Sequence, residues 1–276
     1  MTAQPLISVC IPTYNQTIHL RKLLNTTFSQ KEVAFEVIIS DDSSTNDVAE
    51  LVNEFKNNGF NIDYYKNTPA LGAPKNWNYG ISLAKGEYIK IMHHDQWFED
   101  DFALKKLLYK IINDKKTFVF SACKNDFRGR ISEFRMNSKQ LENIKKEPEN
   151  LILANLIGGP TAILYHREAN IQYDEKIIWL VDVEFYLQLF RKGFKVEYID
   201  EILYTSMTDA DSLTNNNLID TEKQLYEYSY LFNKYVKKRS IFKRFKYITG
   251  IYKILILPLN KKSYLTQFAR FIKRII

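Results

Sequence analysis

Cysteine is scarce in this sequence, and signals for export or membrane insertion are missing. The 276 residues include two cysteines, Cys10 and Cys123, which excludes a disulfide framework and a zinc site built from paired cysteines. The N-terminus lacks a charged segment, and the apolar run over residues 6–11 is too short for a signal sequence. No apolar run reaches 18 residues, because Lys253 and Pro258 interrupt the best candidate. These absences predict a cytoplasmic protein without a membrane-spanning helix.

Acidic residues are absent from the end of the chain. No aspartate or glutamate follows Glu227, whereas 13 of the 39 lysines and arginines lie in residues 228–276. The other 26 basic residues stand against 32 acidic ones, so residues 1–227 carry a net charge of −6 although the whole chain carries +7. An acidic body argues against a basic groove for nucleic acid. We therefore predict no nucleic-acid partner and expect a separate role for the basic tail.

Strand and helix patterns alternate along the first ~95 residues, and 45% of the chain is apolar, enough for a core. The expected strands are 7–12, 35–40, 62–65 and 88–92, and the expected helices are 18–29, 47–57 and 74–84. Strands separated by helices in this way pair in parallel through right-handed crossovers. The sequence predicts an α/β fold with a single Rossmann-like, mostly parallel sheet flanked by helices.

The pattern is less regular after residue 95. We expect helices over 104–111 and 183–192 and strands over 118–122, 161–165 and 196–199, while residues 124–147 give no clear pattern. Nothing in the sequence suggests a repeat or a flexible linker. We predict one catalytic domain over residues 1–215 and a basic helical tail over residues 216–276.

Carboxylates follow two of the expected strands. Asp42 follows the second strand, and Asp95 follows the fourth strand with His93 and His94 beside it. Ligands of an open parallel sheet bind beyond the carboxyl ends of its strands. An isolated Asp–Ser segment can merely cap a helix, and a polar segment after a strand can be only a surface turn. A carboxylate beside imidazoles also suits a divalent cation that bridges a diphosphate, with Asp95 as the candidate ligand.

A third carboxylate, Asp182, begins an expected helix whose apolar stripe contains Val183, Tyr186 and Leu187. Asp182 lies off that stripe and can be only an N-cap. With a cation at Asp95 to stabilise a departing diphosphate, it can instead remove the proton of an attacking hydroxyl. A single base opposite the leaving group predicts glycosyl transfer by in-line displacement, with inversion at the anomeric carbon.

The series of motifs resembles the family-two inverting glycosyltransferases, which have the A-type nucleotide-diphospho-sugar fold. The likeness covers roughly residues 6–205 and rests on the segments 7–15 (ISVCIPTYN), 40–44 (SDDSS), 76–80 (NWNYG) and 84–89 (AKGEYI). The resemblance implies that Asp182 is the general base and that Asp95, with His93, binds Mn²⁺ or Mg²⁺. It also implies a nucleotide-sugar site that contains Pro12, Thr13, Tyr14, Asn15, Asp42, Asn76, His94 and Asp95, with Asp42 at the base.

The chain departs from the family's pattern in two places. His93 stands where the first aspartate of the D-x-D element is usual, and Gln96 replaces the aspartate or asparagine that often follows. Because Mn²⁺ tolerates imidazole better than Mg²⁺ does, we expect lower metal affinity or a shift toward Mn²⁺. After the last strand, where the family often has a histidine, this chain has the segment 207–212 (MTDADS).

The basic tail contains two amphipathic helical patterns. Their apolar positions are Tyr228, Leu231, Phe232 and Tyr235, then Leu265, Phe268, Ile272 and Ile275. Helices packed on the body with a solvated basic face would explain this pattern. A membrane-surface contact is favoured because each basic residue near an anionic leaflet contributes about 1 kcal/mol. We therefore predict peripheral attachment of residues 228–276 to the inner face of the cell membrane.

The predicted function is sugar transfer from a nucleoside-diphosphate donor, by family habit a UDP-sugar. The acceptor would be a saccharide or a lipid-linked molecule in bacterial surface polysaccharide or oligosaccharide synthesis. One alternative is a sugar-phosphate nucleotidyltransferase, but such enzymes usually have a glycine-rich, basic loop after the first strand, and residues 13–17 (TYNQT) contain neither. Another is a membrane-associated binding module whose metal site has decayed at His93 and Gln96.

Overall fold

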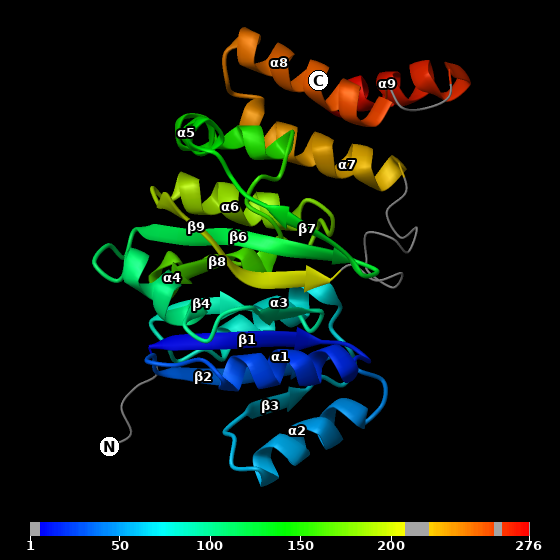
Figure 1. Cartoon of the computed structure of the whole chain (residues 1–276). Helices are drawn as coiled ribbons and strands as arrows, with labels where there is room; N and C mark the ends of the chain where they lie inside the picture. Colours follow the sequence, from blue (N-terminus) through cyan, green and yellow to red (C-terminus); the bar gives the residue numbers. More distant parts are fainter. Residues whose placement is uncertain (1–5, 208–220, 257–260, 276) are drawn as a thin grey trace.

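The computed structural model describes residues 6–207, 221–256 and 261–275, and these form one sheet with helices on both faces (Figure 1). The strand order is β3-β2-β1-β4-β8-β6-β9-β5, with β7 paired to β6. The strands are β1 Ile7–Thr13, β2 Phe35–Asp41, β3 Asp63–Lys66, β4 Tyr88–Ile91, β5 Gln96–Phe98, β6 Thr117–Phe127, β7 Arg130–Phe134, β8 Ile163–His166 and β9 Lys195–Met207. Strands β1 to β4, β6 and β9 run in one direction, which confirms the predicted mostly parallel sheet.

Two apolar cores lie on the two faces of the sheet. Helices α1, α2 and α4 fill one core, and α3, α6 and the tail helices fill the other. The helices are α1 Ile18–Phe28, α2 Asp47–Asn57, α3 Ala73–Ser82, α4 Ala103–Ile111, α5 Ser138–Lys146, α6 Val181–Arg191, α7 Thr221–Leu231, α8 Ile241–Ile251 and α9 Lys261–Ile275. A short π-helical turn, η4 Phe232–Val236, extends α7. The expected helices of the first half are therefore present within a few residues of their predicted ends.

Gly86, the glycine of the AKGEYI segment, stands where the backbone of β1 leaves no room for a side chain. A β-carbon at this position would lie 2.7 Å from the backbone nitrogen of Ser8 and 2.8 Å from the backbone carbon of Ile7. The Gly86 amide instead donates hydrogen bonds to Ser8 Oγ and to Glu36 Oε1. This close approach lies just before β4 and brings the start of that strand alongside β1.

Residues 124–147, which showed no clear pattern, form the end of β6, the strand β7 and helix α5. Strand β7 is mostly exposed, so it lacks the apolar alternation by which a strand is recognised. Helix α5 begins with a capping box, in which Asn137 Oδ1 accepts a hydrogen bond from the Gln140 amide and Gln140 Oε1 accepts one from the Asn137 amide. The short strand β5 was not predicted either.

The tail packs on the body of the molecule (Figure 1). Its first apolar stripe, Tyr228, Leu231, Phe232 and Tyr235, is buried in the same core as α6. The protein itself therefore covers this face, as the packed-helix explanation required. The predicted domain boundary at residue 215 lies outside the described residues, and so do the side chains of Leu265 and Phe268. Among the described helices, none is long and apolar enough to cross a membrane.

Candidate active site

The carboxyl ends of β1, β2 and β4 meet at one edge of the sheet. Pro12 lies opposite Ser40 in the pairing of β1 with β2, and the Asp42 amide donates to the Thr13 carbonyl over 3.0 Å. His94, just after β4, has a hydrogen bond with the backbone of Pro12. The structure thus brings Pro12, Thr13, Asp42 and His94 close together, although they come from three separate segments.

Asp42 holds a loop rather than a helix end. Its carboxylate accepts hydrogen bonds from Asn67 Nδ2 at 2.8 Å, from the Leu71 amide at 3.1 Å and from the Gly72 amide at 2.8 Å. The N-cap residue of α2 is Asn46, which makes no side-chain cap hydrogen bond. Asp42 therefore shapes the loop between β3 and α3. If Asp42 also binds the nucleotide base as predicted, its carboxylate accepts hydrogen bonds from both the loop and the base.

Asn67 is a polar hub that sequence reasoning missed. Besides Asp42, its Nδ2 group donates to Ser40 Oγ at 3.2 Å and to Asn76 Oδ1 at 3.0 Å. Ser40 Oγ also donates to Asn76 Oδ1. Asn76 is buried, so its amide oxygen supports this network beneath the site. No motif marks Asn67, which stands between a short strand and a loop.

Tyr14 and Asn15 form the turn after β1. Asn15 has a left-handed backbone with φ of 48°, its amide donates to Ser43 Oγ at 2.7 Å, and its Oδ1 accepts from the Ser44 amide at 2.9 Å. These bonds fasten the first loop to the SDDSS segment. Tyr14 is 57% exposed, so its ring is free to stack against a planar group that enters from solvent.

His93 has the properties of a neutral imidazole. Burial, with a smaller effect of His94, lowers the His93 pKa from 6.5 to about 3, so the ring is uncharged at neutral pH. Its Nε2 atom is shut off from solvent and has no hydrogen-bond partner among the described residues. The ring centroid lies 4.6 Å from that of Trp77, and the His93 amide donates to Thr161 Oγ1. Neutral imidazole is the form that binds metals.

Asp95 is half-buried, and its carbonyl accepts a hydrogen bond from the Met207 amide at the end of β9. Gln96, in contrast, is buried and ties β5 to β9, because its Nε2 donates to Ser206 Oγ at 3.1 Å. Gln96 is thus a structural residue at a position where the family often has a carboxylate. The rest of the MTDADS segment, residues 208–212, lies outside the described residues.

A divalent cation would find at most two protein ligands after β4. The part of the chain that the structure describes contains no group of three or more histidine, cysteine, aspartate or glutamate side chains able to hold a metal. The uncharged Nε2 of His93 and the carboxylate of Asp95 fit a site in which phosphate and water oxygens complete the coordination.

Asp182 lies in the first turn of α6, after the N-cap Leu180, and therefore does not cap that helix. Its side chain is half-buried, while Oδ1 is shut off from solvent and has no hydrogen-bond partner among the described residues. Burial, and then the negative charge of Glu227, raise the Asp182 pKa from 3.8 to about 8. A carboxyl group with a pKa near the working pH is suited to exchange a proton with a bound hydroxyl.

An aromatic cluster joins Asp182 to the end of β4. The Trp77 ring lies 4.6 Å from His93 and 5.1 Å from Tyr173 between centroids. The pKa of Tyr173 is raised by burial, with smaller effects of the charges of Tyr165 and Asp182, so Asp182 acts electrostatically on this ring. His93 therefore belongs to the same cluster as Tyr173, on which the charge of Asp182 acts. Asp95 and Asp182 both keep part of their surface exposed.

Two further residues set this arrangement and were missed from the sequence. Asn78 of α3 forms a pair of hydrogen bonds with the backbone of Tyr173, one to its carbonyl and one from its amide. Lys90 is buried in β4, where its ammonium donates to the Thr161 carbonyl and burial lowers its pKa to about 7. A lysine within an apolar strand pattern was the one visible signal for such a buried contact.

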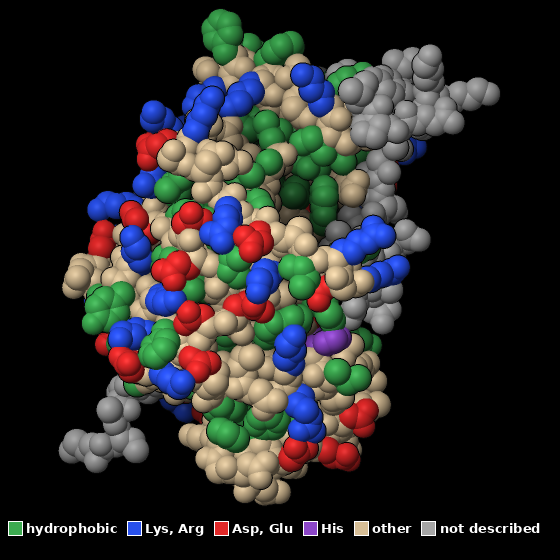
Figure 2. All heavy atoms as spheres, viewed as in Figure 1, with side chains coloured by type: hydrophobic (Ala, Val, Ile, Leu, Met, Phe, Trp, Pro, Cys, Tyr) green, Lys and Arg blue, Asp and Glu red, His purple; other side chains and the backbone are tan. Residues whose placement is uncertain are grey.

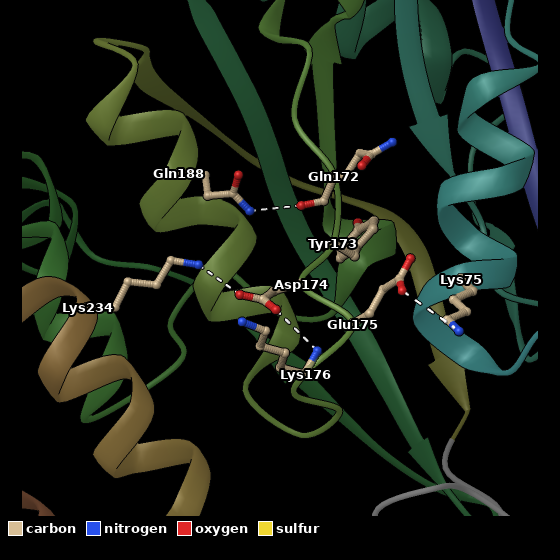
Figure 3. Close-up of a pocket in the computed structure, with 8 residues that line it drawn as sticks. All are labelled: Lys75, Gln172, Tyr173, Asp174, Glu175, Lys176, Gln188 and Lys234. Atoms are coloured by element: carbon tan, nitrogen blue, oxygen red, sulfur yellow. Dashed lines mark hydrogen bonds and ion pairs between the residues drawn. The ribbon is translucent and has the colours of Figure 1, made fainter.

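An open cavity of about 590 Å³ lies beside this cluster, between α3, residues 172–176, α6 and η4 (Figure 3). Asp174 binds Lys234 at 2.8 Å, and Glu175 lies 4.0 Å from Lys75. With Lys176, the lining contains three lysines and two carboxylates, and four of these five groups form the two ion pairs. The wall of the cavity includes Tyr173, a member of the aromatic cluster.

Comparison with known proteins identifies the family and the fold. Residues 8–174 match the family model described as glycosyl transferase family 2. The abequosyltransferase RfbV of Salmonella typhimurium is 38% identical over 99 residues, which make up 35% of this chain and 30% of that protein. The crystal structure of S. aureus TarS 1–349 with UDP-GlcNAc superposes with a TM-score of 0.73 at 16% identity, over 98% of this chain and 81% of that one. The mannosyltransferase PcManGT of Pyrobaculum calidifontis, in complex with GDP-Man and Mn²⁺, superposes with a TM-score of 0.63 at 15% identity. The superposition covers 99% of this chain and 75% of that one.

Proposed function

Because this chain belongs to glycosyl transferase family 2, we propose that it transfers a sugar from a nucleoside diphosphate to a hydroxyl group, with inversion at the anomeric carbon. The observation that carries the proposal is the state of Asp182, a half-buried carboxyl whose pKa is raised to about 8 and whose charge acts on Tyr173, a member of the cluster that contains His93. A group of this kind is suited to accept the proton of an attacking hydroxyl.

The reaction needs one proton transfer and one displacement. The acceptor oxygen attacks the anomeric carbon from the face opposite the diphosphate, and its proton passes to Asp182. The bond from the anomeric carbon to the phosphate oxygen breaks, and its electron pair leaves with the nucleoside diphosphate. One displacement of this type inverts the anomeric centre.

The proposed donor site consists of the residues at the carboxyl ends of β1, β2 and β4. Tyr14 offers an exposed ring for a nucleoside, and Asn15 holds the loop that presents it. A UDP-sugar is the proposed donor, with support from the TarS complex with UDP-GlcNAc. The likeness to an abequosyltransferase of Salmonella supports an acceptor in bacterial surface polysaccharide or oligosaccharide synthesis, either a saccharide or a lipid-linked molecule.

His93 and Asp95 are the residues proposed to hold Mn²⁺ or Mg²⁺. When bound, such a cation supplies positive charge that stabilises the departing diphosphate. The mannosyltransferase PcManGT, which shares the fold, was crystallised with Mn²⁺. Because one of the two ligands is an imidazole, Mn²⁺ is the expected preference.

The proposal is tested by incubating the purified chain with a panel of nucleotide sugars and measuring release of nucleoside diphosphate with and without Mn²⁺. Metal-dependent release from at least one donor is the expected result. A nucleotidyltransferase would instead release pyrophosphate from a nucleoside triphosphate and a sugar phosphate. A binding module would bind a nucleotide sugar without releasing any product, and either outcome contradicts the proposal.

The pH dependence of turnover should report Asp182. The base must be deprotonated, and its pKa in the donor-free protein is about 8. We expect kcat/KM to rise about tenfold per pH unit below that value and to level off above it. Initial rates between pH 5.5 and 9.5, at constant ionic strength, measure this limb. A flat profile across this range would show that no group with a raised pKa acts as the base.

The membrane contact is proposed to involve the first turns of α8. Ile241, Phe242 and Phe245 are 63%, 85% and 66% exposed on this helix. Lys238 and Arg244 lie next to them in the sequence, and no acidic residue follows Glu227. Figure 2 shows basic and protruding hydrophobic side chains together at the end of the molecule where α8 lies in Figure 1. Exposed aromatic and basic groups on one helix suit an anionic lipid surface, here the cytoplasmic leaflet of the cell membrane.

Replacing both Phe242 and Phe245 with serine should reduce binding to vesicles of phosphatidylcholine and phosphatidylglycerol at least about tenfold, because each buried phenylalanine contributes roughly 1.5 kcal/mol or more. Cosedimentation measures the partition. The matched control is Tyr109→Ser, which removes an aromatic ring that is 71% exposed on α4. Equal partition of all three proteins contradicts the contact. Deleting the tail is a poorer test, because it would uncover the core around α6.

A further inference from the structure

Glu227, on α7, is a buried carboxylate that reaches the backbone just before α6. Its oxygens accept hydrogen bonds from the amides of Ile178 at 2.9 Å, Trp179 at 2.9 Å and Leu180 at 2.7 Å. The side chain is 5% exposed. Three consecutive amides of one segment therefore converge on one carboxylate from a helix almost fifty residues later in the chain.

The segment that Glu227 holds leads directly into the helix that carries Asp182. The first amides of a helix have no partner within the helix, and a carboxylate near them also interacts favourably with the helix dipole. Leu180 is the N-cap of α6 and Asp182 is the second helical residue. The direction in which α6 starts, and with it the position of the Asp182 carboxyl, therefore depends on the contact with Glu227.

We propose that Glu227 is a positioning residue for Asp182, through which the basic tail takes part in building the catalytic site. This inference rests on the proposed function, in which Asp182 accepts the proton of the acceptor. Glu227 itself makes no contact with a reacting atom. Its carboxylate fixes residues 178–180, and its negative charge lies close enough to Asp182 to influence proton binding there.

The charge gives the proposal a measurable consequence. Among the described residues, the ionisable groups that interact electrostatically with Asp182 include Glu227 from α7, Tyr186 from α6, Tyr173 from the preceding segment and Tyr204 from β9. Burial raises the pKa of the three tyrosines well above 10, so they stay neutral in the working range. Glu227 is thus the one group among these four whose charge acts on Asp182 near neutral pH.

A second contact between the tail and α6 offers a matched control. Glu184 is fully buried in α6 and binds Lys234 Nζ at 2.8 Å and the Tyr235 hydroxyl at 2.6 Å, both from η4. Lys234 also binds Asp174, as Figure 3 shows. Removing the charge of Glu184 should loosen the tail as removing that of Glu227 does. Burial and Glu227, rather than Glu184, set the pKa of Asp182.

The experiment compares the full-length wild type with Glu227→Gln, Glu227→Asp and Glu184→Gln. Glu227→Gln removes the charge and replaces one carboxylate oxygen with an NH2 group, which leaves either the Ile178 or the Leu180 amide without its acceptor. We expect its kcat/KM at high pH, where the profile is level, to fall roughly tenfold to a hundredfold, as for a modest displacement of a catalytic group. The pH below which kcat/KM declines should also become lower. Glu227→Asp keeps the charge on a shorter side chain. Its kcat/KM at high pH should therefore fall, while the pH below which kcat/KM declines should stay near the wild-type value. Thermal unfolding measures the loss of stability in each variant.

A carbon NMR titration of Asp182 in the donor-free protein separates this inference from the proposed function. The midpoint of Asp182 should fall in Glu227→Gln and stay unchanged in Glu184→Gln, whether or not the protein releases a nucleoside diphosphate. The contradicting result has two parts. The Asp182 midpoint and the pH at which kcat/KM falls would stay at their wild-type values in Glu227→Gln, and its plateau kcat/KM would fall only as far as that of Glu184→Gln. Glu227 would then only stabilise the fold, and the positioning role would be wrong.

Discussion

Asp182→Asn is expected to lower the rate of transfer about 10³-fold, because a positioned general base contributes roughly 10²- to 10⁴-fold. Asparagine has nearly the same shape as aspartate but does not accept the proton. The affinity for the nucleotide should stay within about twofold, since the donor residues lie at the ends of β1, β2 and β4. Single-turnover rates and titration with UDP measure the two effects separately.

The same substitution should not cost stability, which separates lost chemistry from misfolding. The pKa of Asp182 is raised from 3.8 to about 8, so the folded protein favours the protonated carboxyl. The free energy of unfolding of the wild type therefore falls as the pH rises from about 4 to about 8. Asparagine carries no charge, so the unfolding midpoint of Asp182→Asn at pH 8.5 should equal or exceed that of the wild type.

Asp174→Asn is the matched control. Burial acts to raise the pKa of Asp174, but the contacts with Lys234 and Tyr230 have the larger combined effect and lower it. The ionised form therefore contributes stability that is present above its unfolded pKa and is lost as the pH falls through the folded value. Asp174→Asn should lower the unfolding midpoint at neutral pH while its turnover stays within about tenfold of wild type. Normal turnover by Asp182→Asn would remove the base assignment, whatever the control does.

The first half of the fold could be predicted because its signals are local. Helix α2 buries Val48, Leu51, Val52 and Phe55 at helical spacing, and β1 is a mostly apolar strand that is buried throughout. The donor-side residues could be proposed for the same reason, since most of them follow strands within short motifs. Strands β5 and β7 were missed because β5 has three residues and β7 is mostly exposed, so neither presents a buried periodic face.

The contacts that complete the site could not be predicted because they join distant segments. Glu227 attracted notice only as the last acidic residue of the chain, and nothing local marks it as the partner of residues 178–180. Asn78 and Tyr173 are likewise 95 residues apart. The apolar stripe of the tail was assigned to a membrane, whereas the core around α6 covers it. Periodicity identifies a face that must be covered but not what covers it.

Asp95→Ala should cause the second large loss, roughly 10²- to 10³-fold in kcat/KM, because it removes the one carboxylate proposed to hold the cation opposite the developing charge of the diphosphate. Binding of Mn²⁺ in the presence of UDP, followed by electron paramagnetic resonance, should weaken in parallel. If Asp95→Ala keeps the wild-type affinity for Mn²⁺ and its rate, Asp95 is not a metal ligand in this protein.

His93→Asp provides the complementary test, because it restores the carboxylate that is usual at this position. Oxygen ligands favour Mg²⁺, whereas the uncharged imidazole of His93 favours Mn²⁺. The ratio of the rates with Mg²⁺ and Mn²⁺ should therefore rise in His93→Asp and remain low in the wild type. An aspartate next to Trp77 will be poorly solvated without a cation, so Mg²⁺ should also raise the unfolding midpoint of His93→Asp more than that of the wild type. The neutral control His93→Asn should show neither change. An unaltered metal preference in His93→Asp would mean that the imidazole does not face the cation, and that Asp95 alone supplies the protein's share of the coordination.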